Sequence, residues 1–347
     1  MTTDRGDFSF AYDAGNRRTS RTYPNGTATA YAYDPNNRLT GMATTKSGAT
    51  IASTTYTLDD AGNRITKSGG STSWSYAYDA IYRLRQATGS GRTETYTYDA
   101  VGNRLTSGGL TISPEQTTTY AYDGEDRMTG VTITQGGKTK EIRFGYDPFG
   151  RRISKTIQSD AIGTDCANNT CPRTTYYLYD GPNIALEYDQ ASNITARYTH
   201  GPNIDEPLAV EKDNQAYYYH ADGLGSVIAL SDAQGSIVQQ YDYDSFGNMT
   251  TTGGITQPFA FTSREFDPET GMYFYRARYY DPKVGRFVTK DPIGFKGGIN
   301  VFAYVQNNPV NKLDPSGLYD QPYPIGGSIG VEGHFIYGYG RDTHYCC

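Results

Sequence analysis

Two aspartates near the end of the sequence occur in nearly identical settings, "DPIGF" (291–295) and "DPSGL" (314–318), 23 residues apart (314 − 291). Two carboxyl groups held close together cannot both ionise, so one keeps its proton while the other can act as a base toward water. In each copy the glycine permits a tight turn and the proline fixes φ, which gives the carboxylate a defined direction. If Asp291 and Asp314 lie close together they could do this chemistry, but each motif alone is most often a structural turn.

Three arginines lie shortly before these motifs, in "RARYYDPKVGRF" (276–287), and two of them are candidates for a role beside the aspartates. Either Arg278 or Arg286 could hold the ionised carboxylate or stabilise a developing oxyanion. Salt bridges within a sheet are the alternative for both residues.

A repeated unit in the first half of the chain indicates which elements position these residues. It recurs seven times, as "FAYDAGNRRTS" (10–20), "YAYDPNNRLTG" (31–41), "YTLDDAGNRIT" (56–66), "YAYDAIYRLRQ" (76–86), "YTYDAVGNRLT" (96–106), "YAYDGEDRMTG" (120–130) and "FGYDPFGRRIS" (144–154). Alternating aromatic residues place two rings on one face of a strand, and the aspartate with its Gly/Asn/Pro-rich tetrad supplies a turn. An arginine four or five residues after the aspartate is expected to pair with it across the turn.

The spacing of the units predicts the architecture. Successive aspartates lie 20 to 25 residues apart, which fits one β-hairpin per unit. We expect the hairpins to stack sideways into one long sheet, each burying its neighbour's aromatic stripe. The predicted fold class is all-β, and the alternative is an ordinary tyrosine-rich β-sandwich.

The composition agrees with a folded β protein and excludes several classes of function. Of the 347 residues 33 are tyrosine, and 14% are aromatic, which a disordered chain would not be. The net charge of −6 argues against a general binder of nucleic acid or of anionic membranes. No segment approaches the roughly 18 apolar residues of a membrane span. The first residues lack the apolar region of a signal peptide.

The repeats and the second half of the chain resemble the Rhs family, whose YD repeat also occurs in the C component of Tc toxins and in teneurins. The segments "YYYHADGLGSVIALSDAQGSIVQQYDYDSFGN" (217–248), "FTSREFDPETGMYFYRARYYDPKVGRFVTKDPIGF" (261–295) and "GGINVFAYVQNNPVNKLDPSGL" (297–318) resemble the Rhs core-associated region. The resemblance implies a spiralling β-sheet that forms a shell around a C-terminal toxin. With about 310 repeat and core residues, this chain is expected to form a partial shell or an open, curved sheet.

The resemblance also implies the function and the division of the chain. Residues 1–216 are expected to form the hairpin array, 217–318 the core with the self-cleavage segment, and 319–347 a variable C-terminal segment. The cut is placed between Leu318 and Tyr319 and is assigned to Asp291 and Asp314, acting at most once per chain. The expected partners are the chain's own C-terminal segment, a secretion-system component or an immunity protein. The expected location is outside a bacterial cell or on its surface, by a route other than a Sec signal.

Other readings and sites stay open at this point. A non-catalytic structural, adhesive or self-assembling β protein is the alternative function, and a glycan-binding repeat is a third. Cys166 and Cys171 are either a disulfide or two free thiols. No cofactor or metal is expected, because the residues His334, His344, Cys346 and Cys347 match no usual ligand spacing. The 29 residues after Leu318 (347 − 318) are too few for a working toxin domain, and they could be a truncated toxin, a peptide held in the shell or a strand that completes the sheet.

Overall fold

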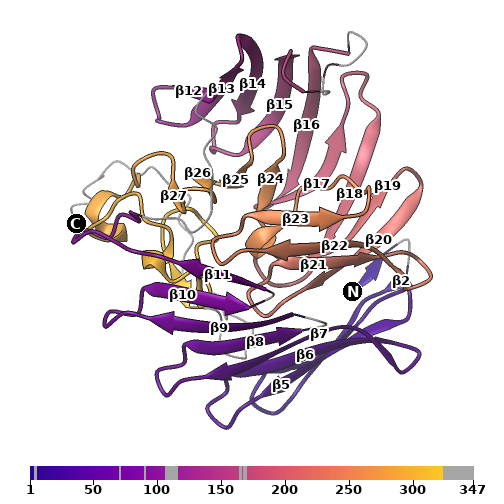
Figure 1. Cartoon of the computed structure of the whole chain (residues 1–347). Coiled ribbons are helices and arrows are strands. Elements are labelled where there is room, and N and C mark those ends of the chain that lie inside the picture. The colour runs from indigo at the N-terminus through magenta and orange to yellow at the C-terminus, as the bar shows by residue number, and fades with distance from the viewer. Residues whose placement is uncertain are drawn as a thin grey trace, which may run out of the picture.

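The protein consists of two large antiparallel sheets and a smaller C-terminal group of strands (Figure 1), in a computed structural model. The structure describes residues 1–3, 6–69, 72–89, 91–105, 116–163, 166 and 170–322. Within both large sheets every strand pairs with its neighbours in sequence, so each sheet is a meander. The predicted all-β fold of stacked hairpins is confirmed, but the hairpins form two large sheets and not the one long sheet that was expected.

The first sheet has nine strands and the second has twelve. The nine strands are β3 (Ser9–Tyr12), β4 (Arg18–Thr22), β5 (Thr27–Tyr33), β6 (Leu39–Lys46), β7 (Ala49–Leu58), β8 (Arg64–Gly69), β9 (Thr72–Tyr78), β10 (Leu84–Gly89) and β11 (Arg92–Thr95). The twelve are β12 (Gln116–Tyr122), β13 (Met128–Gln135), β14 (Lys138–Tyr146), β15 (Arg152–Asp160), β16 (Arg173–Asp180), β17 (Asn183–Tyr188), β18 (Ile194–His200), β19 (Pro207–Lys212), β20 (Gln215–Ala221), β21 (Val227–Ser231), β22 (Ile237–Tyr243) and β23 (Met249–Thr252).

The remaining elements are short. They are β1 (Thr2–Thr3) with β2 (Gly6–Asp7), a four-stranded sheet of β24 (Glu265–Asp267), β25 (Met272–Tyr275), β26 (Arg278–Asp281) and β27 (Arg286–Phe287), the pair β28 (Lys312–Leu313) and β29 (Gln321–Pro322), and the 3-10 helices η2 (Phe261–Ser263), η3 (Gly294–Gly297) and η4 (Val305–Asn307). Among the described residues, none of the helices has the length and apolar character needed to cross a membrane.

The repeat aspartate closes each hairpin turn. Asp34 shows the pattern, since its Oδ1 accepts the backbone N–H groups of Asn36 and Arg38, each at 2.9 Å. Its Oδ2 accepts the Arg38 Nε–H at 2.6 Å, and Asn37, the third residue after the aspartate, has φ of 65°. The same ion pair forms in four more units, at Asp13, Asp79, Asp123 and Asp147. The predicted pairing is confirmed for an arginine four residues after the aspartate.

An arginine five residues after the aspartate does not pair with it but points inward. Where this position is apolar it is buried, as at Leu39, Leu84 and Met128. Where it is arginine, the guanidinium reaches the second half of the chain, and Arg64 donates to the carbonyls of Gly223 and Val310 at 2.8 and 2.7 Å. The arginine four residues after the aspartate therefore closes its own turn, whereas the arginine five residues after it contacts the second half of the chain. The sequence pattern does not distinguish these two roles.

The second tyrosine of the repeat joins adjacent hairpins. The Tyr78 hydroxyl donates to the Arg64 carbonyl at 2.6 Å, and the Tyr98 hydroxyl donates to the Leu84 carbonyl at 2.6 Å. The same bond is made by the hydroxyl groups of Tyr33, Tyr146, Tyr179 and Tyr243. A buried ring thus keeps its polar end bonded, which explains why the repeat uses tyrosine rather than phenylalanine.

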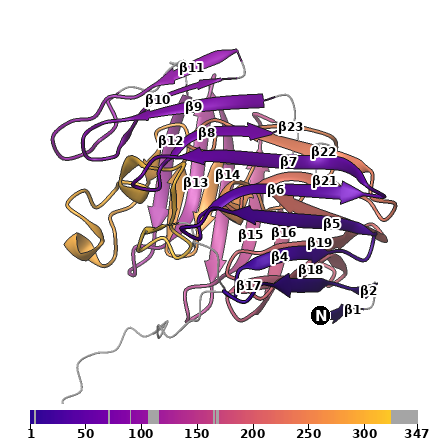
Figure 2. The ribbon, with the colours of Figure 1, turned by 90° about the horizontal axis from the view of Figure 1, so that it is seen from below.

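The two large sheets pack against each other and against the C-terminal strands. Tyr23 of the first sheet donates to the Tyr219 carbonyl of the second at 2.8 Å. The strands β24 to β27 lie between the strands β12 to β14, at the start of the second sheet, and the strands β9 to β11 (Figures 1 and 2). There Phe144 packs on Tyr279 with ring centroids 5.1 Å apart. The proposed division at residue 216 falls inside β20, so the sheet continues across it.

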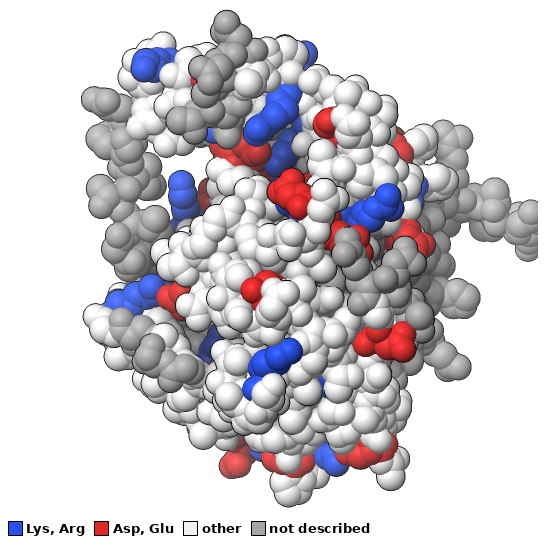
Figure 3. All heavy atoms as spheres, turned by 90° about the vertical axis from the view of Figure 1, so that its right-hand side faces the viewer, with Lys and Arg blue, Asp and Glu red and all other residues white. Residues whose placement is uncertain are grey.

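Charged side chains of both signs are interspersed on the face shown in Figure 3, without a single-sign patch.

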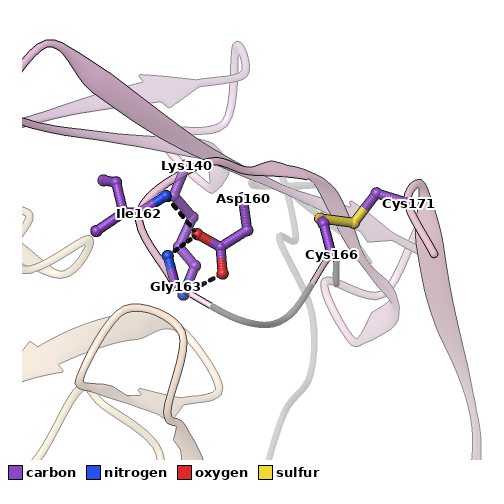
Figure 4. Close-up of a disulfide and its surroundings, with 6 residues drawn as sticks. All are labelled: Lys140, Asp160, Ile162, Gly163, Cys166 and Cys171. Atoms are coloured by element: carbon purple, nitrogen blue, oxygen red, sulfur yellow. Dashed lines mark hydrogen bonds and ion pairs between the residues drawn. A yellow bond between two sulfur atoms is a disulfide. The ribbon is translucent and has the colours of Figure 1, made fainter. Parts of the chain in front are cut away.

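Cys166 and Cys171 form a disulfide between β15 and β16 (Figure 4), which resolves the alternative left open by the sequence. Near it, the Asp160 carboxylate accepts the backbone N–H groups of Ile162 and Gly163 at 3.0 and 2.6 Å. Asp160 also pairs with Lys140 at 3.4 Å.

Because this disulfide closes a loop of only a few residues, its contribution to stability is modest. We expect the double change Cys166→Ser and Cys171→Ser to lower the free energy of unfolding by about 2 kcal/mol at most. Urea unfolding of the oxidised wild type and of the double variant measures this difference in free energy. A loss several times larger would mean that the loop does more than restrain the unfolded chain.

Candidate active site

The segment that contains the expected cut runs beside the β25–β26 hairpin and is held through its backbone. The Ala277 N–H donates to the Ser316 carbonyl at 3.2 Å. The Arg276 guanidinium donates to the Pro315 carbonyl, and the Arg278 Nε–H donates to the Gly317 carbonyl. A β-carbon on Gly317 would lie 2.3 Å from the Tyr275 carbonyl oxygen, so this close approach requires glycine. The residues before Leu318 are thus positioned through their backbone carbonyl groups, and the close approach at position 317 requires glycine.

Arg278 brings the two predicted aspartates together. Its Nη2 lies 2.9 Å from Asp291 Oδ2 and 3.5 Å from Asp314 Oδ2. Its Nη1 donates to the Val301 carbonyl at 3.1 Å, and the guanidinium carbon lies 3.6 Å from the centre of the Phe287 ring. Arg278 and both aspartates are buried, with Asp314 only 2% exposed. One cation therefore faces two carboxyl groups in a site largely closed to solvent.

Both aspartates sit in turns of the repeat type. The third residue after each aspartate has positive φ, 63° at Gly294 and 71° at Gly317, as in the repeat turns. In the YD units Oδ2 of the aspartate is held by a side chain within its own turn, whereas in Asp291 and Asp314 Oδ2 faces Arg278. The two DPxG sequences are therefore repeat turns in which Oδ2 of the aspartate faces Arg278 instead of a side chain of the same turn.

Asp314 contacts the peptide bond at which the cut is expected. Its Oδ1 accepts the backbone N–H groups of Leu318 and Tyr319, each at 3.1 Å. The Ser316 hydroxyl also donates to Oδ1 at 3.2 Å. Burial raises the pKa of Asp314 to about 6, although Arg278 and these hydrogen bonds oppose the shift. Asp314 is thus the more readily protonated carboxyl and lies at the nitrogen side of the Leu318–Tyr319 bond.

Asp291 lies on the carbonyl side of the same bond. Its Oδ1 accepts the Ile293 N–H at 3.0 Å, which leaves Oδ2 to Arg278. A β-carbon built on Gly297 would lie 2.5 Å from Asp291 Oδ2 and 3.2 Å from the Leu318 carbonyl oxygen, so both atoms border the same small space. Burial raises the pKa of Asp291, and the ion pair with Arg278 opposes that shift.

Arg286, the other arginine considered from the sequence, is exposed. Its guanidinium carbon lies 5.8 Å from the centre of the Phe302 ring, and in the described part of the chain no ion pair joins it to Asp291 or Asp314. The structure thus places Arg278, and not Arg286, between the two carboxylates.

Several residues that hold the segment were missed in the sequence. Asp205 pairs with Arg276 at 2.6 Å and with Arg264 at 2.7 Å, which fixes the arginine that holds Pro315. Beyond the expected cut, Lys312 pairs with Asp320 at 2.7 Å. In "YRAR" (275–278) an arginine two positions before Arg278 is a signal in the sequence for Arg276, but nothing in the sequence pattern connects Asp205 to this hairpin.

The buried residue His220 does not join this site. His220 Nε2 lies 2.8 Å from Ser231 Oγ, but both residues are buried, and burial lowers the pKa of His220 to about 3. This buried pair joins β20 to β21. The histidines and cysteines of 334–347 lie outside the described residues.

Comparison with known proteins gives a consistent result. The sequence matches the family described as the teneurin YD-shell over residues 1–310. The tRNA3(Ser)-specific nuclease WapA of Bacillus spizizenii is 34% identical over 209 residues, which cover 57% of this chain and 8% of the nuclease. Double-stranded DNA deaminase toxin A of Burkholderia cenocepacia is 31% identical over 228 residues, 58% of this chain and 16% of the toxin. The chain thus spans less than a fifth of these relatives' length.

Among solved structures, the crystal structure of TcdB2-TccC3-TEV has a TM-score of 0.75 with this chain. The match covers 91% of this chain and 19% of that one, at 22% sequence identity. At this identity the likeness establishes a common fold and nothing about activity.

Proposed function

The chain belongs to the teneurin YD-shell family, and from this premise we propose that it is a shell-type scaffold that holds its own C-terminal segment and releases it by cutting itself after Leu318. The observation that carries the proposal is the position of one carboxyl group on each side of the Leu318–Tyr319 bond, with Arg278 between the two groups. A purely structural pair of turns needs neither the shared arginine nor the contact with the Tyr319 N–H.

The proposed reaction is hydrolysis of one peptide bond. The Asp291 carboxylate takes a proton from water as the water oxygen attacks the Leu318 carbonyl carbon. The C–N bond then breaks as the Asp314 carboxylic acid gives its proton to the leaving Tyr319 nitrogen. The products are a carboxyl group on Leu318 and a free amino group on Tyr319. Arg278 keeps Asp291 ionised beside the protonated Asp314.

The proposal assigns the parts of the chain as the sequence suggested. Residues 1–216 supply the hairpin array, 217–318 the core that cuts, and 319–347 the released segment. The names of two relatives, a nuclease and a deaminase toxin, support an effector role for segments carried by such shells. Export from a bacterial cell, with a secretion component or an immunity protein as partner, completes the proposal.

The proposal predicts a bell-shaped dependence of self-cleavage on pH. Asp314 must be protonated, so the rate falls about tenfold per pH unit once the pH rises above about 6. Asp291 must be ionised, so the rate also falls as the pH drops through its raised pKa. The full chain, purified unfolded and refolded into buffers from about pH 4 to about pH 8, is followed by denaturing electrophoresis. A rate that keeps rising above pH 7 would contradict the role of Asp314 as the acid.

The alternative of a non-catalytic β scaffold predicts a different result in the same experiment. A refolded chain that stays at full length at every pH would mean that the turns at Asp291 and Asp314 have only a structural role.

A further inference from the structure

The segment "GFKGG" (294–298) contains three glycines, and the backbone explains only two of them. Gly294 and Gly298 have φ of 63° and 133°, which side chains with a β-carbon rarely adopt. Gly297 is not among the residues with positive φ. Around Gly294 and Gly298 a β-carbon would meet nothing within 4 Å, whereas at Gly297 it would be in collision. The reason for glycine at 297 is therefore the space beside it.

That space is bordered by the groups that react. A β-carbon on Gly297 would lie 2.5 Å from Asp291 Oδ2, 3.1 Å from Asp291 Cγ and 3.2 Å from the Leu318 carbonyl oxygen. Carbon atoms do not approach oxygen to 2.5 Å without a shift of one of them. The region between the carboxylate and the carbonyl is also where an attacking water must enter.

None of the bordering atoms is free to move without loss of a contact. Asp291 Oδ2 is held 2.9 Å from Arg278 Nη2, and Asp291 Oδ1 is held 3.0 Å from the Ile293 N–H. The Leu318 carbonyl belongs to the peptide group whose N–H, on Tyr319, is held at 3.1 Å by Asp314. An added methyl group would therefore turn the Asp291 carboxylate away from Arg278, or move the Leu318 carbonyl away from the carboxylate.

We infer that Gly297 is a positioning residue for self-cleavage. Its missing side chain lets the Asp291 carboxylate, Arg278 and the Leu318 carbonyl converge and leaves room for water between them. This inference rests on the proposed function, because it concerns the geometry of the same reaction. Under this inference η3, which ends at Gly297, forms the wall of the site opposite Asp314.

The test is the variant Gly297→Ala in the full chain, beside Gly124→Ala and Lys296→Ala. Gly124 lies in a turn without positive φ and with open space around it, and Lys296 is the exposed neighbour. We expect Gly297→Ala to lower the first-order rate of self-cleavage at least about tenfold. The two controls should cleave at the wild-type rate.

The pH profile separates positioning from general damage to the fold. If the carboxylate is pushed away from Arg278, the pKa of Asp291 rises further, so the acid side of the profile moves to higher pH. A Gly297→Ala chain with the wild-type rate and an unshifted acid side would overturn the inference. If the wild-type chain does not cleave, the proposed function itself fails.

Thermal unfolding is measured in the background Asp314→Asn, in which no cut is expected. We expect Gly297→Ala to unfold within a few degrees of its parent there. A variant that is unfolded in this background would assign Gly297 to the fold and overturn the positioning role.

Discussion

The variant Asp314→Asn is expected to remain a full-length chain under conditions in which the wild type loses residues 319–347. Asparagine has nearly the shape of aspartate, and its side-chain oxygen can still accept the N–H groups that Leu318 and Tyr319 donate to Oδ1. It has no acidic proton to give to the leaving nitrogen. Since a positioned general acid contributes about 10²–10⁴ in rate, we expect a loss of at least about 100-fold.

The variant Asp291→Asn is expected to show the same loss for a different reason. The amide cannot take a proton from water, and it removes the negative charge that pairs with Arg278. Asp232→Asn is the matched control, because Asp232 Oδ1 accepts two backbone N–H groups, from Gln234 and Ser236, in a turn of the same type. Intact-mass measurements after refolding compare the three variants. Release of the fragment at the wild-type rate from either Asp291→Asn or Asp314→Asn would contradict the dyad.

The largest effect on stability is expected at Arg152, which joins β15 to the C-terminal strands. It is 1% exposed, donates to the Asp267 carboxylate and lies 2.9 Å from Glu265 Oε2. Replacing it by methionine leaves two buried carboxylates without this cation, although Lys155 stays 3.0 Å from Asp267 and Arg264 stays 3.7 Å from Glu265. We expect Arg152→Met to lower the free energy of unfolding by about 3–5 kcal/mol.

The neighbouring residue provides the control for this prediction. Arg151 pairs with Asp147 within its own turn at 2.7 Å, with 36% of the arginine side chain exposed. Arg151→Met should therefore lower the free energy of unfolding by at most about 1 kcal/mol. Urea unfolding of both variants in the uncleaved Asp314→Asn background measures the two values. Equal losses would mean that the inward and outward arginines of the repeat contribute alike, contrary to the structure.

The pH dependence of stability should reflect the same cluster. Burial disfavours the charge on Asp267, but Arg152 and Lys155 outweigh it and hold the pKa of Asp267 below its usual value. The stability that this carboxylate contributes is therefore present at neutral pH and is lost as the pH falls through its lowered pKa.

The sequence was sufficient to predict the fold because each repeat contains the local signals for two strands and the turn between them. The alternation in "YAYD" places rings on one face, and the turn tetrad ends each strand, so hairpins and their order could be predicted from local rules. The sequence could not predict which of the two arginine positions pairs with the aspartate and which points inward. This depends on which face of the returning strand meets the second half of the chain. Arg38 and Arg64 look alike in the sequence, yet one closes its turn and the other reaches Gly223.

The candidate site was predicted only in part. Asp291, Asp314 and Arg278 were identified from motifs and resemblance, and the structure brings these three together. The contribution of Gly297 was not predicted, because a glycine in a glycine-rich loop carries no signal until the groups around it are known. Asp205, which holds Arg276, was missed because it lies 71 residues away in the chain.

The most direct test of the account is the mass of the fragments released by the refolded wild-type chain. The account predicts two species, one that ends at Leu318 and one that begins at Tyr319, with masses that add up to that of the intact chain plus one water. A cut at any other bond, or a single uncleaved mass, would contradict it.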